Sequence, residues 1–69
     1  MHKYLVIFEK ARENYSAYSP DIPGCIATGK TRQEVEKNIK EAIEFHLEGL
    51  EKDGLPLPEP ASFTEYVEV

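Results

Sequence analysis

The sequence predicts an α+β fold in the order β-β-β-α-β, in which an antiparallel three-stranded meander and a parallel C-terminal strand pack against one helix. Three observations predict this fold class. Short runs of strand-forming residues come first, one long stretch with helical periodicity follows, and the last segment alternates between apolar and polar residues. With 69 residues, we expect a single domain over residues 1–69 with one modest core.

The first two predicted strands lie in the N-terminal part of the sequence. Residues 4–8 are apolar throughout and rich in β-formers, which is typical of a central strand buried on both faces. Residues 14–19 alternate, with Tyr15 and Ala17 on one face and Ser16 and Tyr18 on the other. We expect these two strands to pair antiparallel.

A proline-containing connection separates the second strand from the third. Pro20 and Pro23 lack amide donors and fix φ, so residues 20–24 cannot continue a central strand and should form a stiff connection. Residues 25–28 predict a short third strand. Gly29 follows it and can turn the chain toward the next element.

The sequence from Thr31 predicts one amphipathic helix. Thr31 and Glu34 match a capping box, in which the threonine hydroxyl accepts from the Glu34 amide and the Glu34 carboxylate accepts from the Thr31 amide. Gly54 is suited to ending the helix near Asp53 in a left-handed conformation. The helical period gathers one apolar stripe that should lie against the sheet, formed by Val35, Ile39, Ala42, Ile43, His46, Leu47 and Leu50.

The segment after the helix predicts a spacer and a fourth strand. Prolines alternate through residues 55–60, which favours an extended polyproline-like chain. From Ser62 to Val69 apolar and polar residues alternate, as in an edge strand. After three antiparallel passes and one helix, this strand should run parallel to the first strand and lie beside it.

The charge balance favours a protein partner over a nucleic acid. Thirteen acidic and eight basic residues give a net charge of -5, opposite in sign to a nucleic-acid-binding surface. We therefore expect no direct nucleic-acid binding. A basic protein would be attracted at long range, although the same acidity would also serve solubility alone.

Small domains usually need support beyond their core, and the sequence favours oligomerisation as that support. Cys25 is the one cysteine, so no intrachain disulfide can form, and His2 and His46 lack the paired spacing of a zinc site. We therefore predict a homodimer or tetramer without a cofactor. The N-terminal apolar run has only five residues, so the sequence predicts no signal peptide and no membrane span, and a cytoplasmic protein is expected.

The sequence does not predict an enzyme. A meander followed by a helix also begins a ribonuclease H-like domain, but that chemistry needs carboxylates around divalent ions, and no acid interrupts residues 4–8. His46 has no nearby nucleophile, and Cys25 suits packing in a strand better than reactivity. Phe45 lies off the apolar stripe, where it is either an interface anchor or an isolated exposed ring.

The continuous stretch YSAYSPDIPGCIATGKTRQEVEKNIKEAIEFHLEGLEKDGLPLPEP resembles the HicB antitoxin family. The resemblance covers residues 15–60. It implies a truncated ribonuclease H-like fold without ribonuclease activity, usually oligomeric, that binds a small basic HicA-like toxin. Such toxins cleave RNA, and the antitoxin would mask the RNA-binding surface or the catalytic histidine of the toxin.

Many members of the family carry a DNA-binding segment after this core, and the sequence ends at Val69, so we do not expect repression from these residues alone. Two alternatives to toxin neutralisation stay open. These are an orphan oligomeric domain without a toxin and a metal-dependent nucleic-acid enzyme.

The predicted contact residues lie on the proline-fixed connection and the second strand. A proline-fixed loop loses little entropy on docking, which favours it as a binding surface. Asp21 has an alternative role in closing a turn. The six predicted partner-binding residues are Tyr15, Tyr18, Asp21, Ile22, Pro23 and Gly24.

Overall fold

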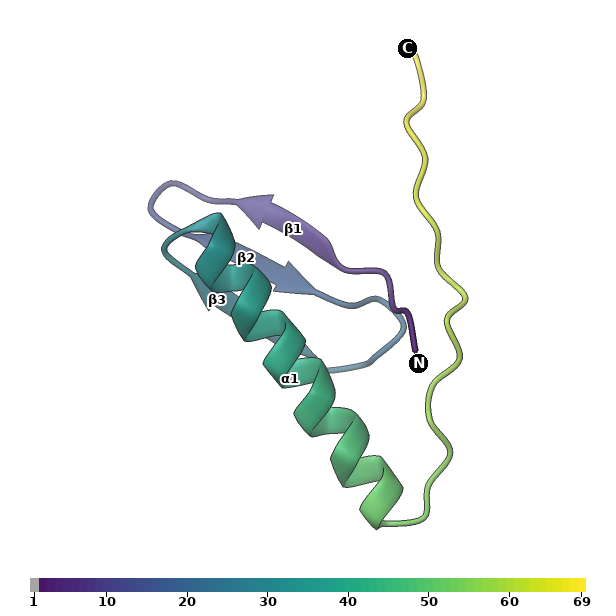
Figure 1. The fold of residues 1–69 in the computed structure, drawn as a ribbon. Coiled ribbons are helices and arrows are strands. Elements are labelled where there is room, and N and C mark those ends of the chain that lie inside the picture. Colours follow the sequence, from purple (N-terminus) through teal and green to yellow (C-terminus); the bar gives the residue numbers. More distant parts are fainter. Residues whose placement is uncertain (1) are drawn as a thin grey trace.

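A computed structural model describes residues 2–69 of the chain, and it is an α+β structure of one antiparallel sheet and one helix (Figure 1). The strands lie in the order β1-β2-β3, and each neighbouring pair is antiparallel. The predicted meander and single helix are therefore confirmed. The elements are β1 (Ile7–Lys10), β2 (Tyr15–Tyr18), β3 (Ile26–Gly29) and α1 (Arg32–Lys52).

Both ends of α1 are capped by local hydrogen bonds. The Thr31 hydroxyl accepts from the Glu34 amide at 3.1 Å, as predicted. The Glu34 carboxylate differs from the prediction, because it accepts from the Lys30 amide at 3.2 Å and not from Thr31. At the other end Gly54 has φ 69, and the amides of Gly54 and Leu55 donate to the carbonyls of Glu51 and Leu50. This is a Schellman motif, so the predicted glycine terminator is confirmed.

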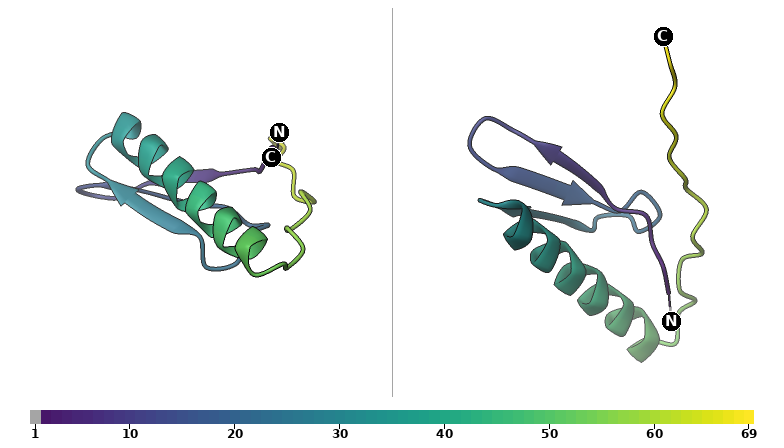
Figure 2. Two further views of the ribbon diagram at one scale, coloured as in Figure 1. Left: turned by 60° about the horizontal axis from the view of Figure 1, so that its bottom comes forward. Right: turned by 45° about the horizontal axis from the view of Figure 1, so that its top comes forward.

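The helix covers one face of the sheet and packs against β3 and β2 (Figure 2). Alternation along β2 turns Ala17 toward the helix, and alternation along β3 turns Ala27 the same way. Only the first part of the apolar stripe of α1 is fully buried, at Val35 and Ile39. The buried core consists of Ala17, Ile22, Cys25, Val35 and Ile39.

Gly29 is required for close packing rather than for a turn. Gly29 does not have a positive φ, whereas Gly24 and Gly54 do. A Cβ atom at position 29 would lie 2.6 Å from the backbone nitrogen of Val35. The glycine therefore lets the end of β3 approach the first turn of α1 at a distance that a side chain would forbid.

We expect Gly29→Ala to destabilise the domain by about 1–3 kcal/mol, because the new methyl group meets backbone atoms that cannot move aside. Gly49→Ala is the matched control. Gly49 lies in α1 with nothing near its Cβ position, so alanine should stabilise the protein by about 0.5–1 kcal/mol. Urea unfolding of both variants measures this difference, and a Gly29→Ala midpoint equal to that of the parent would contradict it.

The first strand differs from its prediction in position and in environment. Residues 4–8 were expected as a central strand, whereas β1 is Ile7–Lys10 and lies at the edge of the sheet. Strand β2 ends at Tyr18 and Pro20 follows, so residues 4–6 have no partner strand on that side. A sequence suited to burial on both faces therefore lies at an edge, with Phe8 43% exposed.

The predicted fourth strand is wrong for the single chain. After α1, residues 55–69 carry no strand and extend along the N-terminal end of the sheet and then away from it (Figure 1). The hydroxyl of Tyr4 donates to the Pro58 carbonyl at 2.6 Å, which holds the spacer against the N-terminal segment. The alternating residues 62–69, here called the tail, are exposed.

Candidate partner-binding site

The face of the sheet opposite α1 carries a row of apolar side chains. Ile7 pairs with Tyr18, and Tyr18 pairs with Ile26, so the three residues lie side by side across the strands. They point away from the helix because Ala17 and Ala27, their neighbours in sequence, point toward it. Ile26 is 65% exposed and Tyr18 is 37% exposed. We call these three residues the outer row.

Residues 19–25, here called the proline loop, adjoin the outer row as two consecutive turns. The Ile22 amide donates to the Ser19 carbonyl at 3.1 Å, and the Cys25 amide donates to the Ile22 carbonyl at 3.2 Å. In the second turn Pro23 precedes Gly24, whose φ of 78 is the value a type II turn needs. Two prolines and two backbone bonds therefore fix the loop before any partner binds.

The base of the proline loop is closed and anchored to the sheet. The Ser19 amide donates to the Cys25 carbonyl at 3.3 Å, and the buried Ser19 hydroxyl donates to the Leu5 carbonyl at 2.9 Å. Ile22 is 1% exposed and belongs to the core cluster. The buried Ile22 side chain and the buried Ser19 hydroxyl thus hold the loop in place.

A shallow, mainly apolar hollow lies where the outer row meets the proline loop. Its volume is about 420 Å³. Hollows of this character next to exposed aromatic and aliphatic side chains are typical of protein contact surfaces. Its lining residues are Tyr18, Ser19, Pro20, Ile22, Pro23, Gly24, Cys25 and Ile26.

Two carboxylates lie on or near this side of the molecule. Asp21 belongs to the proline loop, and Glu9 shares the face of Ile7 but lies two residues further from the loop. The Asp21 carboxylate accepts two hydrogen bonds from Ser62, from its hydroxyl at 2.8 Å and from its amide at 3.1 Å. The bond from the Ser62 hydroxyl, followed by that from its amide, lowers the pKa of Asp21 below its usual range.

The contact between Asp21 and Ser62 should depend on pH. A carboxyl whose folded pKa is depressed contributes stability above its unfolded pKa of about 3.9, and this contribution is lost as the pH falls through the folded value. We expect the Ser62 amide resonance to titrate below pH ~3.9 in an NMR series. In Asp21→Ala the same resonance should not follow this titration, and a folded Asp21 pKa at or above the usual value would contradict the prediction.

The comparison with known proteins decides the family. Residues 4–69 match the family described as HicB-like antitoxin of bacterial toxin-antitoxin system. This chain belongs to that family. A solved chain from the HicA3 and HicB3 toxin-antitoxin complex resembles the HicB-like chain with a TM-score of 0.71 and 38% identity. The likeness covers 87% of this chain and 70% of that chain.

Relatives of the HicB-like chain occur in phage and in bacteria. A protein of Haemophilus phage HP1, described as an uncharacterized 14.9 kDa protein in the rep-hol intergenic region, is 39% identical over 93% of this chain and 48% of its own length. A UPF0150 protein of Helicobacter pylori is 45% identical over 71% of this chain and 68% of its own length. The HicB-like chain therefore spans about half the length of the phage relative.

The structure brings most of the six predicted contact residues of the HicB-like chain to one place. Tyr18, Ile22, Pro23 and Gly24 line the hollow, and Ile22 is the one of the four that is fully buried beneath it. Asp21 belongs to the same loop but is bound to Ser62. We therefore place the candidate site on the outer row and the proline loop.

Tyr15 is separated from the other predicted contact residues. It lies on the helix side of β2, where it packs against the core cluster. Ile7 and Ile26, which lie beside Tyr18, were not among the predicted contact residues. The alternation of Cys25, Ile26 and Ala27 predicts which face of the sheet Ile26 lies on. Its position beside Tyr18 depends on the register between β2 and β3, which the sequence of one strand does not determine.

The other candidate residues of the HicB-like chain occupy structural positions. Cys25 is buried, and this burial raises the pKa of its thiol, which opposes thiolate formation. His46 is half-buried on α1, and Phe45 is 79% exposed. Within residues 2–69 no cluster of three or more His, Cys, Asp or Glu side chains is arranged to hold a metal ion. None of the helical residues in this range forms a stretch that could cross a membrane.

Proposed function

We propose that this HicB-like chain neutralises a small basic HicA-like RNA-cleaving toxin by covering the active surface of the toxin, without performing a reaction itself. The observation that carries this proposal is its likeness, at 38% identity and a TM-score of 0.71, to a chain from a HicA3 and HicB3 toxin-antitoxin complex. Membership of the antitoxin family supports the same role.

The surface proposed to bind the toxin is the outer row together with the proline loop. Tyr18 and Ile26 offer exposed apolar area, and the fixed turns of the loop keep the ordering entropy of docking low. In this proposal Tyr18, Pro23 and Gly24 contact the toxin directly. Ile22 holds their shape from inside, and Tyr15 contributes to folding.

Electrostatics would govern how fast the two proteins meet. A net charge of -5 attracts a basic partner over about one Debye length and raises the association rate. Asp21 in the proline loop and Glu9 on the same face of the sheet as the outer row add local negative charge. Association should therefore slow as the salt concentration rises, with the pair acting in the cytoplasm where the RNA substrates of such a toxin are found.

Co-expression with a short basic toxin encoded next to this gene tests the proposal. We expect a stable complex, restored growth and loss of RNA cleavage when the purified chain is added to the purified toxin. A toxin that cleaves RNA at an unchanged rate with an excess of this chain would refute neutralisation. Persistence of an oligomer without toxin binding would instead favour an orphan scaffold.

A further inference from the structure

An unfilled apolar groove runs between the N-terminal segment and α1, on the helix side of the sheet. Its volume is about 890 Å³. It lies on the opposite face of the sheet from the outer row, so the proposed toxin surface does not use it. We call it the edge groove. Its apolar walls are formed by Tyr4, Val6, Phe8, Ile39, Ile43 and Leu47, and its lining also includes His2, Glu36, Lys40 and Glu44.

The backbone beside the edge groove has a free edge. Strand β1 pairs with β2 on one side, and no described residue pairs with it on the other. Residues 4–8 are apolar throughout, a composition suited to a strand with a neighbour on each side. An unpaired edge of this kind is a template for another strand.

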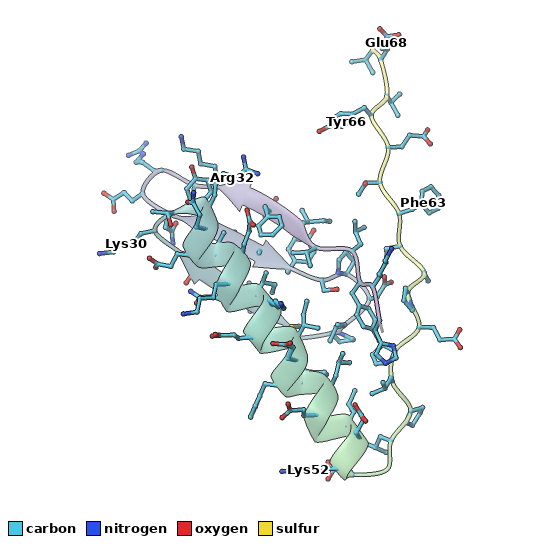
Figure 3. The ribbon with its side chains drawn as sticks, viewed as in Figure 1. Lys30, Arg32, Lys52, Phe63, Tyr66 and Glu68 are labelled. Atoms are coloured by element: carbon cyan, nitrogen blue, oxygen red, sulfur yellow. The ribbon has the colours of Figure 1, made fainter. Side chains whose placement is uncertain are left out.

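The tail alternates like a strand, with three apolar residues and one acid on the same side. Phe63, Val67 and Val69 share this side of an extended chain with Glu65, and Phe63 and Val67 are 82% and 73% exposed. Figure 3 shows Phe63 and Tyr66 projecting to opposite sides of the tail, clear of both the sheet and α1. Eight extended residues span about 26 Å, enough to cover residues 4–10, which span about 23 Å.

We propose that the tail of a second copy of this chain occupies the edge groove as an added strand on β1, so that two copies exchange tails. Phe63, Val67 and Val69 would pack over Val6, Phe8 and Ile43, and the tail backbone would pair with residues 4–8. Two-fold symmetry makes the exchange reciprocal, which closes the assembly as a dimer. This inference is independent of the proposed toxin binding.

The placement of the tail favours a second copy over the same chain as the occupant. Tyr4 holds Pro58, and Asp21 holds Ser62, so the chain is fixed before the tail and at its first residue. The tail leaves its own sheet and helix in Figure 1 and in the right-hand view of Figure 2. The prolines of residues 56–60 stiffen the approach and oppose a reversal toward the groove of the same chain.

Charge gives the exchanged dimer a recognisable salt dependence. Two copies that each carry a net charge of -5 repel one another, and salt screens this repulsion. The dimer should therefore tighten as salt is added. Binding of a basic toxin should respond in the opposite direction, so the two associations can be told apart.

Sedimentation and mixed-label NMR of the full chain test the exchange. We expect a species of twice the 7.9 kDa chain mass. In a mixture of ¹³C-labelled and unlabelled chains, the Phe63 ring should show contacts to Val6 and Ile43 methyl groups of the other chain. A monomer at NMR concentration, or tail contacts confined to one chain, would overturn the proposal.

Two charge-matched variants locate the contact in the tail. Phe63→Asp should raise the dimer dissociation constant at least ~10-fold, because it removes an aromatic ring from the groove. Thr64→Asp adds the same charge on the opposite side of the strand and should change it by less than ~3-fold. Both variants should keep the helical circular dichroism, since the tail lies outside the core. Equal effects of the two variants would overturn the proposed packing.

Discussion

Ile22→Ala is expected to destabilise the domain by about 2–5 kcal/mol, because it removes a fully buried side chain and leaves a cavity under the proline loop. The whole domain is expected to be stable by only about 3–10 kcal/mol at this length. The substitution therefore removes a large share of the free energy of unfolding and should lower the thermal midpoint by at least about 10 °C. Thermal and urea unfolding followed by circular dichroism measure both quantities.

Ile26→Ala is the matched control for this prediction. It deletes the same atoms from a side chain that is 65% exposed on the outer row, so the free energy of unfolding should change by less than about 0.5–1 kcal/mol. Equal losses in the two variants would show that Ile22 is not a specific support of the loop. The comparison therefore separates the residue that shapes the candidate site from one that faces the partner.

Tyr18→Asp is expected to weaken toxin binding at least about 30-fold, because Tyr18 is the central residue of the outer row and a tyrosine hot spot contributes about 2 kcal/mol or more. A carboxylate there would also lose its hydration inside an apolar contact. Calorimetric titration against the purified toxin measures the loss. Tyr18→Phe should retain most of the affinity, since the ring supplies most of the contact area.

Phe45→Asp provides the control for Tyr18→Asp. It introduces the same charge at an aromatic residue that is 79% exposed on α1, away from the outer row. Binding should change less than ~3-fold, and thermal unfolding should show that both variants are folded. Equal loss of affinity in the two variants would place the toxin elsewhere on the molecule.

Local signals were sufficient to predict α1 and the meander. Thr31 and Gly54 act through bonds to neighbouring residues, so the caps of the helix can be read from the sequence. The alternation around Ala17 and the prolines of residues 20–24 likewise give β2 and the connection after it. These elements depend on few contacts that are distant in sequence.

The edge of the sheet could not be predicted in the same way. Residues 4–8 have the composition of a central strand, but a strand becomes central only when a second neighbour pairs with it. Residues 62–69 have the alternation of a strand and no partner in their own chain. Pairing depends on contacts distant in sequence, so the alternation and composition of these two segments could not locate their neighbours.

The candidate site was predicted in part. Proline and glycine chemistry located the loop, and Pro23 and Gly24 line the hollow as expected of exposed turn residues. Ile22 was expected as a contact, but its side chain is buried, since the turn points it inward. The bond between Asp21 and Ser62 joins residues 41 positions apart, a separation that no local pattern reports.

The helix α1 is much longer than the strands on which it lies. Its 21 residues extend about 31 Å, whereas each four-residue strand extends about 13 Å. Val35 and Ile39 are buried near its beginning, and Leu47 and Leu50 near its end are only half-buried. Protection of the backbone amides against hydrogen exchange should therefore decline along the helix, and its last turns should open in small local fluctuations while the sheet and the first turns stay closed.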